Sequence, residues 1–266
     1  MRSLAIAMFA ALALAAPALA VYPGTYAQID SYGLVAGATR FTVSPAGIDT
    51  RIEAVDSHTF ALRRSATVGG RYGVPTMIPA NVRLGMFRDG TRFVLQSTAN
   101  HSRTSFVVVR TSDLSIARTI VLDGSFAFDA LSPDGARLYL IQHTSGDFQH
   151  YIVRAYDLTE DVLLPGRIAD RTQQGWVMRG WPVSRVATAN GRWVYTLYTN
   201  PAGFPFVHAL DTVAGVAHCV GIAWQGSQDE LNSYRLKVVG NRLLVRDAGG
   251  RVYRTIDRTT WAVRLR

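Results

Sequence analysis

Cysteine and lysine are nearly absent from this sequence of 266 residues. Cys219 is the only cysteine, so no disulfide bond can form within the chain. A chain of this length buries enough apolar surface to fold without one. The lone thiol is therefore expected to be a small buried residue, with a nucleophilic role as the alternative.

The near absence of lysine makes the charge of the chain unusual. There are 28 basic and 19 acidic residues, the net charge is +9, and every basic residue except Lys237 is an arginine. Arginine recognises phosphate and carboxylate well, although genome base composition can produce the same bias. The arginines are dispersed, with runs no longer than pairs such as Arg63-Arg64. A nucleic-acid site would cluster them on one face, so no specific nucleic-acid partner is expected.

Long apolar runs are absent after the first twenty residues. Arg2 precedes an apolar run from Leu4 to Ala16, and Pro17 and the small-residue pattern Ala18-Leu19-Ala20 follow it. This order is typical of a secretory signal peptide, and the run is short for a membrane span. We expect a signal peptide at 1–20 with cleavage after Ala20, and a single domain at 21–266 without a transmembrane segment. The mature chain is expected to be a secreted, periplasmic or cell-envelope monomer.

The familiar catalytic and metal-binding motifs are also missing. The chain contains no Gly-x-Ser-x-Gly, no His-Glu-x-x-His, no P-loop and no calcium loop. His143 and His150 flank a turn that contains Asp147, and the three side chains would form a metal site if they met. A plain solvated turn is the favoured interpretation, so neither a metal nor another cofactor is expected.

Helical periodicity is almost absent, and short runs of β-branched and aromatic residues alternate with turn residues. The clearest example predicts a strand at Phe126–Leu131, a turn at Ser132-Pro133-Asp134-Gly135 and a strand at Arg137–Gln142. Pro133 presets the backbone of a type I turn, which Asp134 and Gly135 complete. Such a pattern is typical of an all-β protein.

Two markers recur along the chain at intervals of about fifty residues. One is a turn glycine that leads into an arginine-containing strand. The other is an apolar strand that ends at an acidic turn residue, for which arginine stands in the second copy. The glycines are Gly37, Gly90, Gly135, Gly191 and Gly240, and the strand-ending residues are Asp56, Arg110, Asp157, Asp211 and Asp257. Recurrence in step predicts a fold element, in which the aspartates accept backbone N–H groups of the next turn.

Each period has room for about four strands, which is the blade of a β-propeller. In the third period we expect strands at Phe126–Leu131, Arg137–Gln142, Tyr151–Tyr156 and Val162–Ile168. We predict an all-β propeller of five four-stranded antiparallel blades, with six as the alternative. A ring must join its first and last blades. The stretch 22–35 is then expected to be the inner strand of the first blade or to close the last one, with 261–266 as an outer strand.

The stretch Ser132-Pro-Asp-Gly-x-x-Leu-Tyr-Leu140 and the later Val153-Arg-Ala-Tyr-Asp-Leu158 resemble the repeats of bacterial YVTN/WD40-like and TolB-like β-propellers. The resemblance covers the whole mature chain and is strongest from Gly85 to Ile222. It implies an extracytoplasmic interaction or scaffold protein, although some related propellers are lactonases or quinoprotein-type enzymes. The Trp-Asp dipeptide of classical WD40 repeats is absent, so no site residue is carried over.

The candidate ligand-binding residues lie on the expected inner strands or on the face made by the connecting loops. Arg179, Trp181 and Arg185 fall on one side of a regular strand, although Pro182 predicts a bend there. Arginine beside an aromatic ring suits a carboxylate, phosphate or sugar. The alternative is a structural ion pair between arginine and Asp129, with Trp181 in the core. The candidate set is Asp129, Arg179, Trp181, Arg185 and Tyr198.

The sequence therefore favours a non-catalytic exported binding or scaffold module. Its partner is expected to be a protein or an anionic small molecule or polymer. The alternative is a propeller hydrolase or lactonase with a metal site at the channel, which requires carboxylate, asparagine or histidine ligands converging on the axis. Electrostatic adhesion to an anionic wall polymer or to nucleic acid is a further possibility, and it would require a steep loss of binding with added salt.

Overall fold

The computed structural model describes residues 24–29, 32–78, 80–98, 102–146, 148–170, 177–201 and 203–265. The expected signal peptide, its cleavage point and Asp147 lie outside these residues. The described chain is almost entirely β-strand, and the one helix in it is the single turn α1 (Gln228–Leu231). No described helix is both long enough and apolar enough to cross a membrane.

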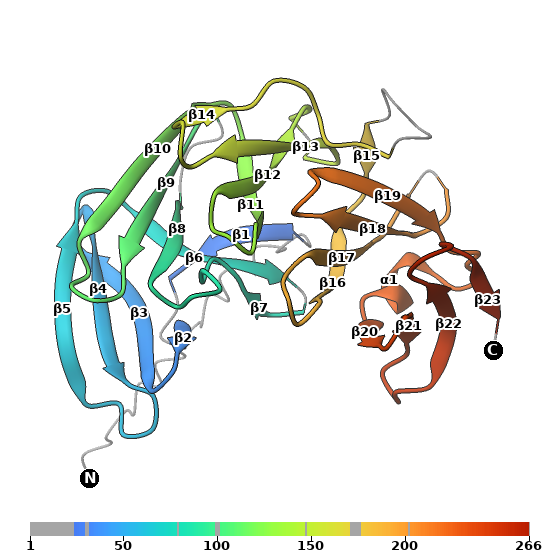
Figure 1. Ribbon diagram of the computed structural model, residues 1–266, viewed down its shortest axis with the longest axis horizontal. Coiled ribbons are helices and arrows are strands. Elements are labelled where there is room, and N and C mark those ends of the chain that lie inside the picture. The colour runs from blue at the N-terminus through green and yellow to red at the C-terminus, as the bar shows by residue number, and fades with distance from the viewer. Residues whose placement is uncertain are drawn as a thin grey trace, which may run out of the picture.

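The strands form five antiparallel sheets that follow one another along the chain (Figure 1). Blade 1 consists of β2 (Leu34–Ala36), β3 (Thr39–Ala46), β4 (Asp49–Asp56) and β5 (Leu62–Val68). Blade 2 consists of β6 (Tyr72–Ile78), β8 (Arg92–Ser97), β9 (Arg103–Arg110) and β10 (Ile116–Asp123). Blade 3 consists of β11 (Phe126–Leu131), β12 (Arg137–His143), β13 (His150–Asp157) and β14 (Val162–Leu163), and β15 (Met178–Arg179) also pairs with β13. Blade 4 consists of β16 (Pro182–Ala187), β17 (Trp193–Tyr198), β18 (Phe206–Asp211) and β19 (Val216–Gly221). Blade 5 consists of β20 (Arg235–Val239), β21 (Arg242–Arg246), β22 (Val252–Asp257) and β23 (Val263–Leu265). The prediction of four-stranded propeller blades is confirmed.

Four apolar cores hold the blades together, and each lies between two successive sheets. Between blades 2 and 3, for example, Phe106 and Ile120 pack with Phe128 and Leu138. In blades 2 to 4 the middle strands β9, β12, β17 and β18 are nearly continuously buried because both of their faces meet a neighbouring blade. The outer strands β5 and β10 are more exposed and carry arginine, as expected for strands with a free edge.

The blades form an open arc, with blades 1 and 5 at its two ends (Figure 1). Among the described residues, no strand pairing and no apolar core joins blade 1 to blade 5. This corrects the expectation that the first and last blades meet in a ring. The physical reason is polarity, because the free face of blade 1 carries Thr42, Ser44, Arg51 and Glu53.

The stretch 22–35 also differs from the expectation. β2 is the inner strand of blade 1, but the preceding β1 (Gly24–Gln28) pairs along its whole length with β6 of blade 2. Only Tyr72 and Gly73 of β6 pair with β8, and the rest of β6 leaves the blade to pair with β1 and β7 (Val82–Arg83). These strands lie on the inner side of the arc, against β11 and β16 (Figure 1).

The third blade shows both the accuracy and the limit of strand prediction. β11 coincides with the predicted strand, and β12 and β13 extend the predicted ranges by one or two residues. The predicted fourth strand at 162–168 is wrong, because β14 ends at Leu163 and only Ile168 returns to the sheet, opposite Val153. Pro165 and Gly166 interrupt the ladder between them, since proline has no N–H to donate.

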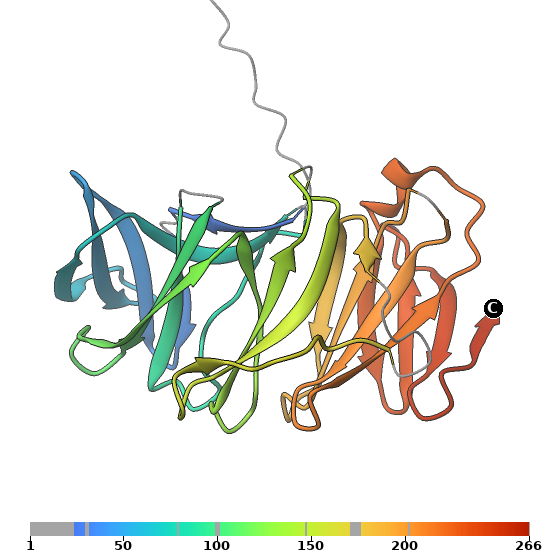
Figure 2. The same cartoon turned by 90° about the horizontal axis from the view of Figure 1, so that it is seen from above.

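The turns after the third strands are built as the repeat predicted. The carboxylates of the four strand-ending aspartates each accept two backbone N–H groups of the following turn, at 2.8–3.1 Å. These bonds hold the pKa of Asp157 below its ordinary range. The aspartates are therefore structural, and hairpin turns of this kind line one side of the arc (Figure 2).

Candidate functional site

Two of the candidate residues, Asp129 and Arg185, form a buried ion pair between blades 3 and 4. The guanidinium of Arg185 donates to the carboxylate and to the backbone carbonyl of Asp129, and its Nε donates to Thr196 at 2.9 Å. Only 5% of the Arg185 side chain and 2% of the Asp129 side chain are exposed. The structural interpretation of this pair, an arginine bound to the aspartate of the preceding inner strand, is confirmed.

A β-bulge in β11 lies at Asp129. The pairing of β11 with β12 shifts between Phe128 and Ala130, which leaves Asp129 without a partner residue on β12. The bulge frees the backbone carbonyl of Asp129 for Arg185, and a bulge also re-aims the side chain of the extra residue.

Arg179 and Trp181 do not join Arg185 on one strand. Arg179 ends β15, where it pairs with His150 of blade 3 and is exposed, whereas β16 begins at Pro182. The break lies at Gly180, whose φ of +100° favours glycine and whose Cβ, if present, would lie 1.9 Å from the carbonyl oxygen of Thr199. Trp181 is half-buried, and its backbone N–H donates to the Thr199 hydroxyl at 2.9 Å.

Tyr198 lies in the core beside the ion pair rather than on the loop face. Its ring is fully buried and stacks on Tyr151 of blade 3 and on Phe206, with a centroid distance of 5.3 Å in each case. His208 meets the Tyr198 ring edge-on at 6.5 Å, and its Nδ1 lies 3.5 Å from the sulfur of Cys219. Blades 3 and 4 therefore share a buried cluster of polar side chains.

Several polar atoms of this cluster have no hydrogen-bond partner among the described residues. They are Oδ2 of Asp129, the hydroxyl oxygens of Tyr151 and Tyr198, and Nε2 of His208. Burying such atoms costs free energy, so the cluster is a costly part of the interface. The set of candidate residues predicted from the sequence contained neither Tyr151 nor His208. A usable signal exists for His208, because the residue three before the strand-ending position is polar in four copies, as Glu53, Arg154, His208 and Arg254.

Burial sets the protonation of the cluster. It raises the pKa of Tyr198, with Asp129 adding to the effect, and it also raises the pKa of Tyr151 well above its ordinary value. It lowers the pKa of His208 from 6.5 to about 4, an effect that Asp129 opposes and Arg185 reinforces. The cluster is thus neutral around the Asp129–Arg185 pair at neutral pH, and His208 is an uncharged imidazole.

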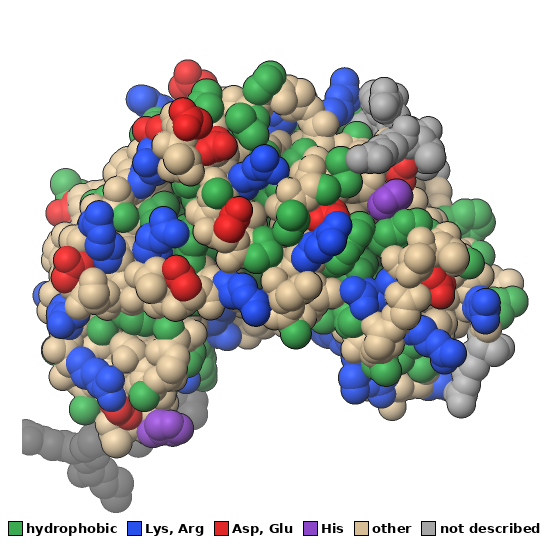
Figure 3. All heavy atoms as spheres, viewed as in Figure 1, with side chains coloured by type: hydrophobic (Ala, Val, Ile, Leu, Met, Phe, Trp, Pro, Cys, Tyr) green, Lys and Arg blue, Asp and Glu red, His purple; other side chains and the backbone are tan. Residues whose placement is uncertain are grey.

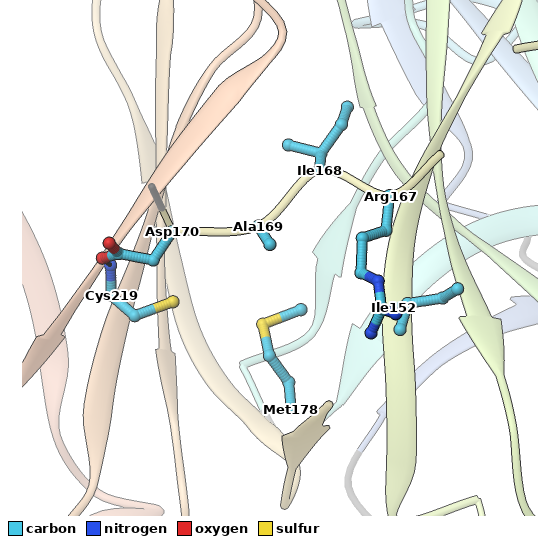
Figure 4. A pocket seen from close by; sticks show the side chains of 7 residues that line it. All are labelled: Ile152, Arg167, Ile168, Ala169, Asp170, Met178 and Cys219. Carbon is cyan, nitrogen blue, oxygen red and sulfur yellow. Dashed lines mark hydrogen bonds between the residues drawn. The ribbon is translucent and has the colours of Figure 1, made fainter. Parts of the chain in front are cut away.

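A small cavity adjoins the cluster near the outer edge of blades 3 and 4 (Figure 4). Its volume is about 10 Å³, room for one water molecule at most. Asp170 and Cys219 face each other there, and the Asp170 carboxylate accepts the backbone N–H of Cys219 at 2.6 Å. Burial, followed by Asp170, raises the pKa of the Cys219 thiol, which favours the buried-residue interpretation over a nucleophile.

The two histidines near position 147 are engaged with their own turn. Nδ1 of His143 lies 3.2 Å from the carbonyl oxygen of Phe148, and Nδ1 of His150 lies 3.2 Å from the Ser145 hydroxyl. The structure describes no cluster of three or more His, Cys, Asp or Glu side chains that could hold a metal.

The most prominent exposed feature is the free face of blade 5. The apolar residues Leu236, Leu243 and Val245 face blade 4, so the alternating residues of the same strands face away from the arc. Cross-strand pairs place Arg235 opposite Arg246, Lys237 opposite Leu244, and Thr255 opposite Arg264. Basic side chains accordingly gather at this end of the molecule (Figure 3). The basic face of blade 5 comprises Arg235, Lys237, Arg242, Arg246 and Arg264.

No family model and no curated protein matches the chain. Among solved structures, TolB from Acinetobacter baumannii is similar over 85% of this chain and 53% of its own, with 15% identity and a TM-score of 0.47. The chain therefore spans about half the length of that TolB. The Cps50 (Swd1) β-propeller domain from Myceliophteria thermophila is 13% identical with a TM-score of 0.51, over 93% of this chain and 72% of its own. A putative 6-phosphogluconolactonase from Bacteroides uniformis is 14% identical with a TM-score of 0.50, over 87% and 68%. The chain thus shares the β-propeller fold, as its repeat predicted.

Proposed function

We propose that the protein is a non-catalytic binding module, exported after cleavage of residues 1–20, that holds an anionic polymer on the basic face of blade 5. The main support for this proposal is the positive charge of that face. Five basic side chains project from one sheet surface that also carries Asp257, opposite Arg242. The directly opposed Arg235 and Arg246 are a like-charge pair. Like charges opposite one another destabilise a sheet, so a polyanion lying across the face would relieve the repulsion.

The partners of these side chains support the proposal. Arg235 donates to the carbonyl oxygens of Asn232 and Tyr234, and Arg246 donates to that of Gly250. Within the described residues, none of the five basic side chains takes part in an ion pair. Their charge is therefore available to a partner, and an arginine-rich sheet face suits carboxylate or phosphate groups.

The ion pair of Asp129 with Arg185 supports a binding role over a hydrolase or lactonase, because it occupies the carboxylate of an inner strand. A channel metal needs convergent oxygen or nitrogen ligands, and Asp129 is engaged with Arg185 instead. Metal analysis of the purified protein tests the alternative. A stoichiometric calcium or zinc ion would favour the enzyme.

Binding of the purified protein to alginate, a polyuronate, tests the proposal, with neutral dextran as the control. We expect binding to alginate alone and a steep loss of it as salt rises, because a polyanion releases counterions on binding. The variant Arg235→Glu/Lys237→Glu should bind at least about tenfold more weakly, because each substitution replaces attraction by repulsion. The matched variant Arg51→Glu/Arg64→Glu on blade 1 should bind as the natural protein does. Equal binding by both variants would contradict the proposal.

A further inference from the structure

A second basic site lies between blades 2 and 3 and is independent of the basic face of blade 5. It is a hollow of about 290 Å³. Arg92 begins β8, Arg110 ends β9 and Arg118 lies on β10, so three adjacent strands of blade 2 each contribute a guanidinium. Val108, Ala117 and Leu158 complete the lining, and among the described residues no carboxylate lines the hollow.

The hollow lies where blade 2 departs from the repeat. In blade 3 the arginine that begins the second strand, Arg137, lies opposite Asp157, and in blade 5 Arg242 lies opposite Asp257. In blade 2 the corresponding pair is Arg92 and Arg110, two like charges on directly opposed residues. Such a pair destabilises a sheet, so this departure has a cost that the fold itself does not require.

The turn after β9 does not need arginine at position 110. The Leu114 N–H donates to the Arg110 carbonyl oxygen at 3.0 Å, and Leu114 has a φ of +62°. The turn of blade 1 has the same form, with 3.0 Å between Phe60 and Asp56 and a φ of +59°. Asp113 accepts the Ser115 N–H at 3.0 Å, as the Thr59 hydroxyl accepts the Ala61 N–H at the same place in the turn of blade 1.

The three guanidinium groups are held in place but are only partly neutralised. Arg92 stacks on the Phe87 ring, 4.2 Å from its centroid. Arg110 donates to the hydroxyl of Ser115 at 3.1 Å. Arg118 is paired with Asp161, whose carboxylate also accepts the hydroxyl of Tyr156 at 2.6 Å. Within the part of the chain that the structure describes, Asp161 is the one carboxylate ion-paired to any of the three.

The Ser132–Gly135 turn of blade 3 also contacts the guanidinium of Arg92. The Nη2 atom of Arg92 lies 2.9 Å from the position that a Cβ of Gly135 would occupy, and Gly135 has a φ of +69°. Glycine is required there on both grounds, since any side chain would strain the turn and displace the guanidinium. The Ser132–Gly135 turn thus orders one side of the hollow.

We propose that this hollow binds the phosphoryl group of a phosphomonoester. A phosphomonoester presents three terminal oxygens, so three guanidinium groups can each donate to it, whereas a carboxylate presents two. Arginine–phosphate pairs are short, charge-assisted and often bidentate. The apolar residues Val108, Ala117 and Leu158 offer contact to the organic part of the ligand, and the volume suits a small molecule.

Calorimetric titration with glycerol 1-phosphate tests the proposal, with inorganic phosphate, acetate and a dialkyl phosphate as comparisons. We expect the monoester and inorganic phosphate to bind, and the diester and acetate to bind at least about tenfold more weakly because each has fewer charged oxygens. Poly(glycerol phosphate) is titrated into the Arg235→Glu/Lys237→Glu variant, which removes polyanion binding at blade 5. Its phosphates are diesters, so binding stronger than that of the monoester would overturn the proposal. Failure of the monoester and of inorganic phosphate to bind would overturn the proposal.

The decisive variant is Arg110→Asp, which restores the repeat. It places an aspartate opposite Arg92, as in blades 3 and 5, so the protein should fold with unchanged circular dichroism and an equal or higher unfolding midpoint. Phosphate affinity should fall at least about tenfold. Arg63→Gln on blade 1 is the matched control and should leave it unchanged. Undiminished affinity in Arg110→Asp would overturn the site. Variants of the basic face of blade 5 should not alter phosphate binding, so the two proposals can fail separately.

Discussion

The middle blades and the terminal blades differ in the pattern of burial along their strands. In blade 4 every residue of β18 (Phe206–Asp211) is buried. In blade 5 the residues of β21 (Arg242–Arg246) alternate between buried and more exposed. The cause is the number of neighbours, because a middle blade packs on both faces and a terminal blade on one. The fully buried β18 therefore marks a blade with two neighbours, although β13 of blade 3 alternates as the strands of the terminal blades do.

This difference also explains how an open arc is stable. The terminal repeats of solenoid proteins carry a polar outer face that ends the stack, and blades 1 and 5 do the same here. Thr42 and Glu53 lie opposite each other on the free face of blade 1, and Arg235 and Arg246 on that of blade 5. The same residues that leave the arc open leave a sheet face accessible to a partner.

The largest expected effect breaks the interface of two middle blades. Arg185→Met leaves the Asp129 carboxylate buried without a partner and should lower the free energy of unfolding by about 3–5 kcal/mol in urea titration. The double variant Asp129→Leu/Arg185→Met should recover most of the loss. The terminal-blade pair Arg63–Asp56 is much more exposed, so Arg63→Met should leave the unfolding midpoint almost unchanged. Equal losses would contradict the contrast between interior and end.

Matched leucine truncations test the contrast directly. Leu140 is fully buried in the core between blades 2 and 3, so Leu140→Ala should cost about 2–5 kcal/mol of unfolding free energy. Leu244 is half-buried on the free face of blade 5, so Leu244→Ala should cost less than about 1 kcal/mol. Losses of similar size would mean that another surface covers the free face.

Acid should destabilise the middle of the arc before its ends. His208 is buried as a neutral imidazole with a pKa of about 4, below its value of 6.5 when unfolded. The unfolded state therefore binds more protons, and stability should fall as pH drops from about 6.5 to about 4, by on the order of 3 kcal/mol. The turn aspartates at the ends, such as Asp56, have pKa values below their ordinary range and titrate at lower pH. Urea titrations between pH 4 and 7 measure the slope, which His208→Gln should abolish.

The smallest expected effect concerns the hydroxyl of Tyr198. It is buried without a hydrogen-bond partner among the described residues, so Tyr198→Phe removes an unpaired polar atom and keeps the stacked ring. The free energy of unfolding should change by less than about 1 kcal/mol, in the stabilising direction. A loss of more than that would show that the hydroxyl has a partner in solution.

Local features of the fold could be predicted because each depends on a few neighbouring residues. The Ser132–Gly135 turn, the two strands beside it and the capping aspartates all follow from turn chemistry and strand preference. Features that depend on contact between blades could not. The bulge at Asp129 and the fully buried position of Tyr198 depend on what the next blade places opposite them. Arg179 and Arg185 share a strand pattern in the sequence, yet belong to different sheets because the chain turns at Gly180.

The sequence by itself determined the repeat, the number of countable blades and the replacement of aspartate by arginine at position 110. Those depend on residue types at regular spacing, which the chain carries without reference to its fold. Only the tertiary structure decided that the arc is open, that Asp129 and Arg185 are bound to each other, and that three arginines of blade 2 line one hollow. The reason is that spacing places residues along strands, whereas packing between sheets decides which faces meet and which stay exposed.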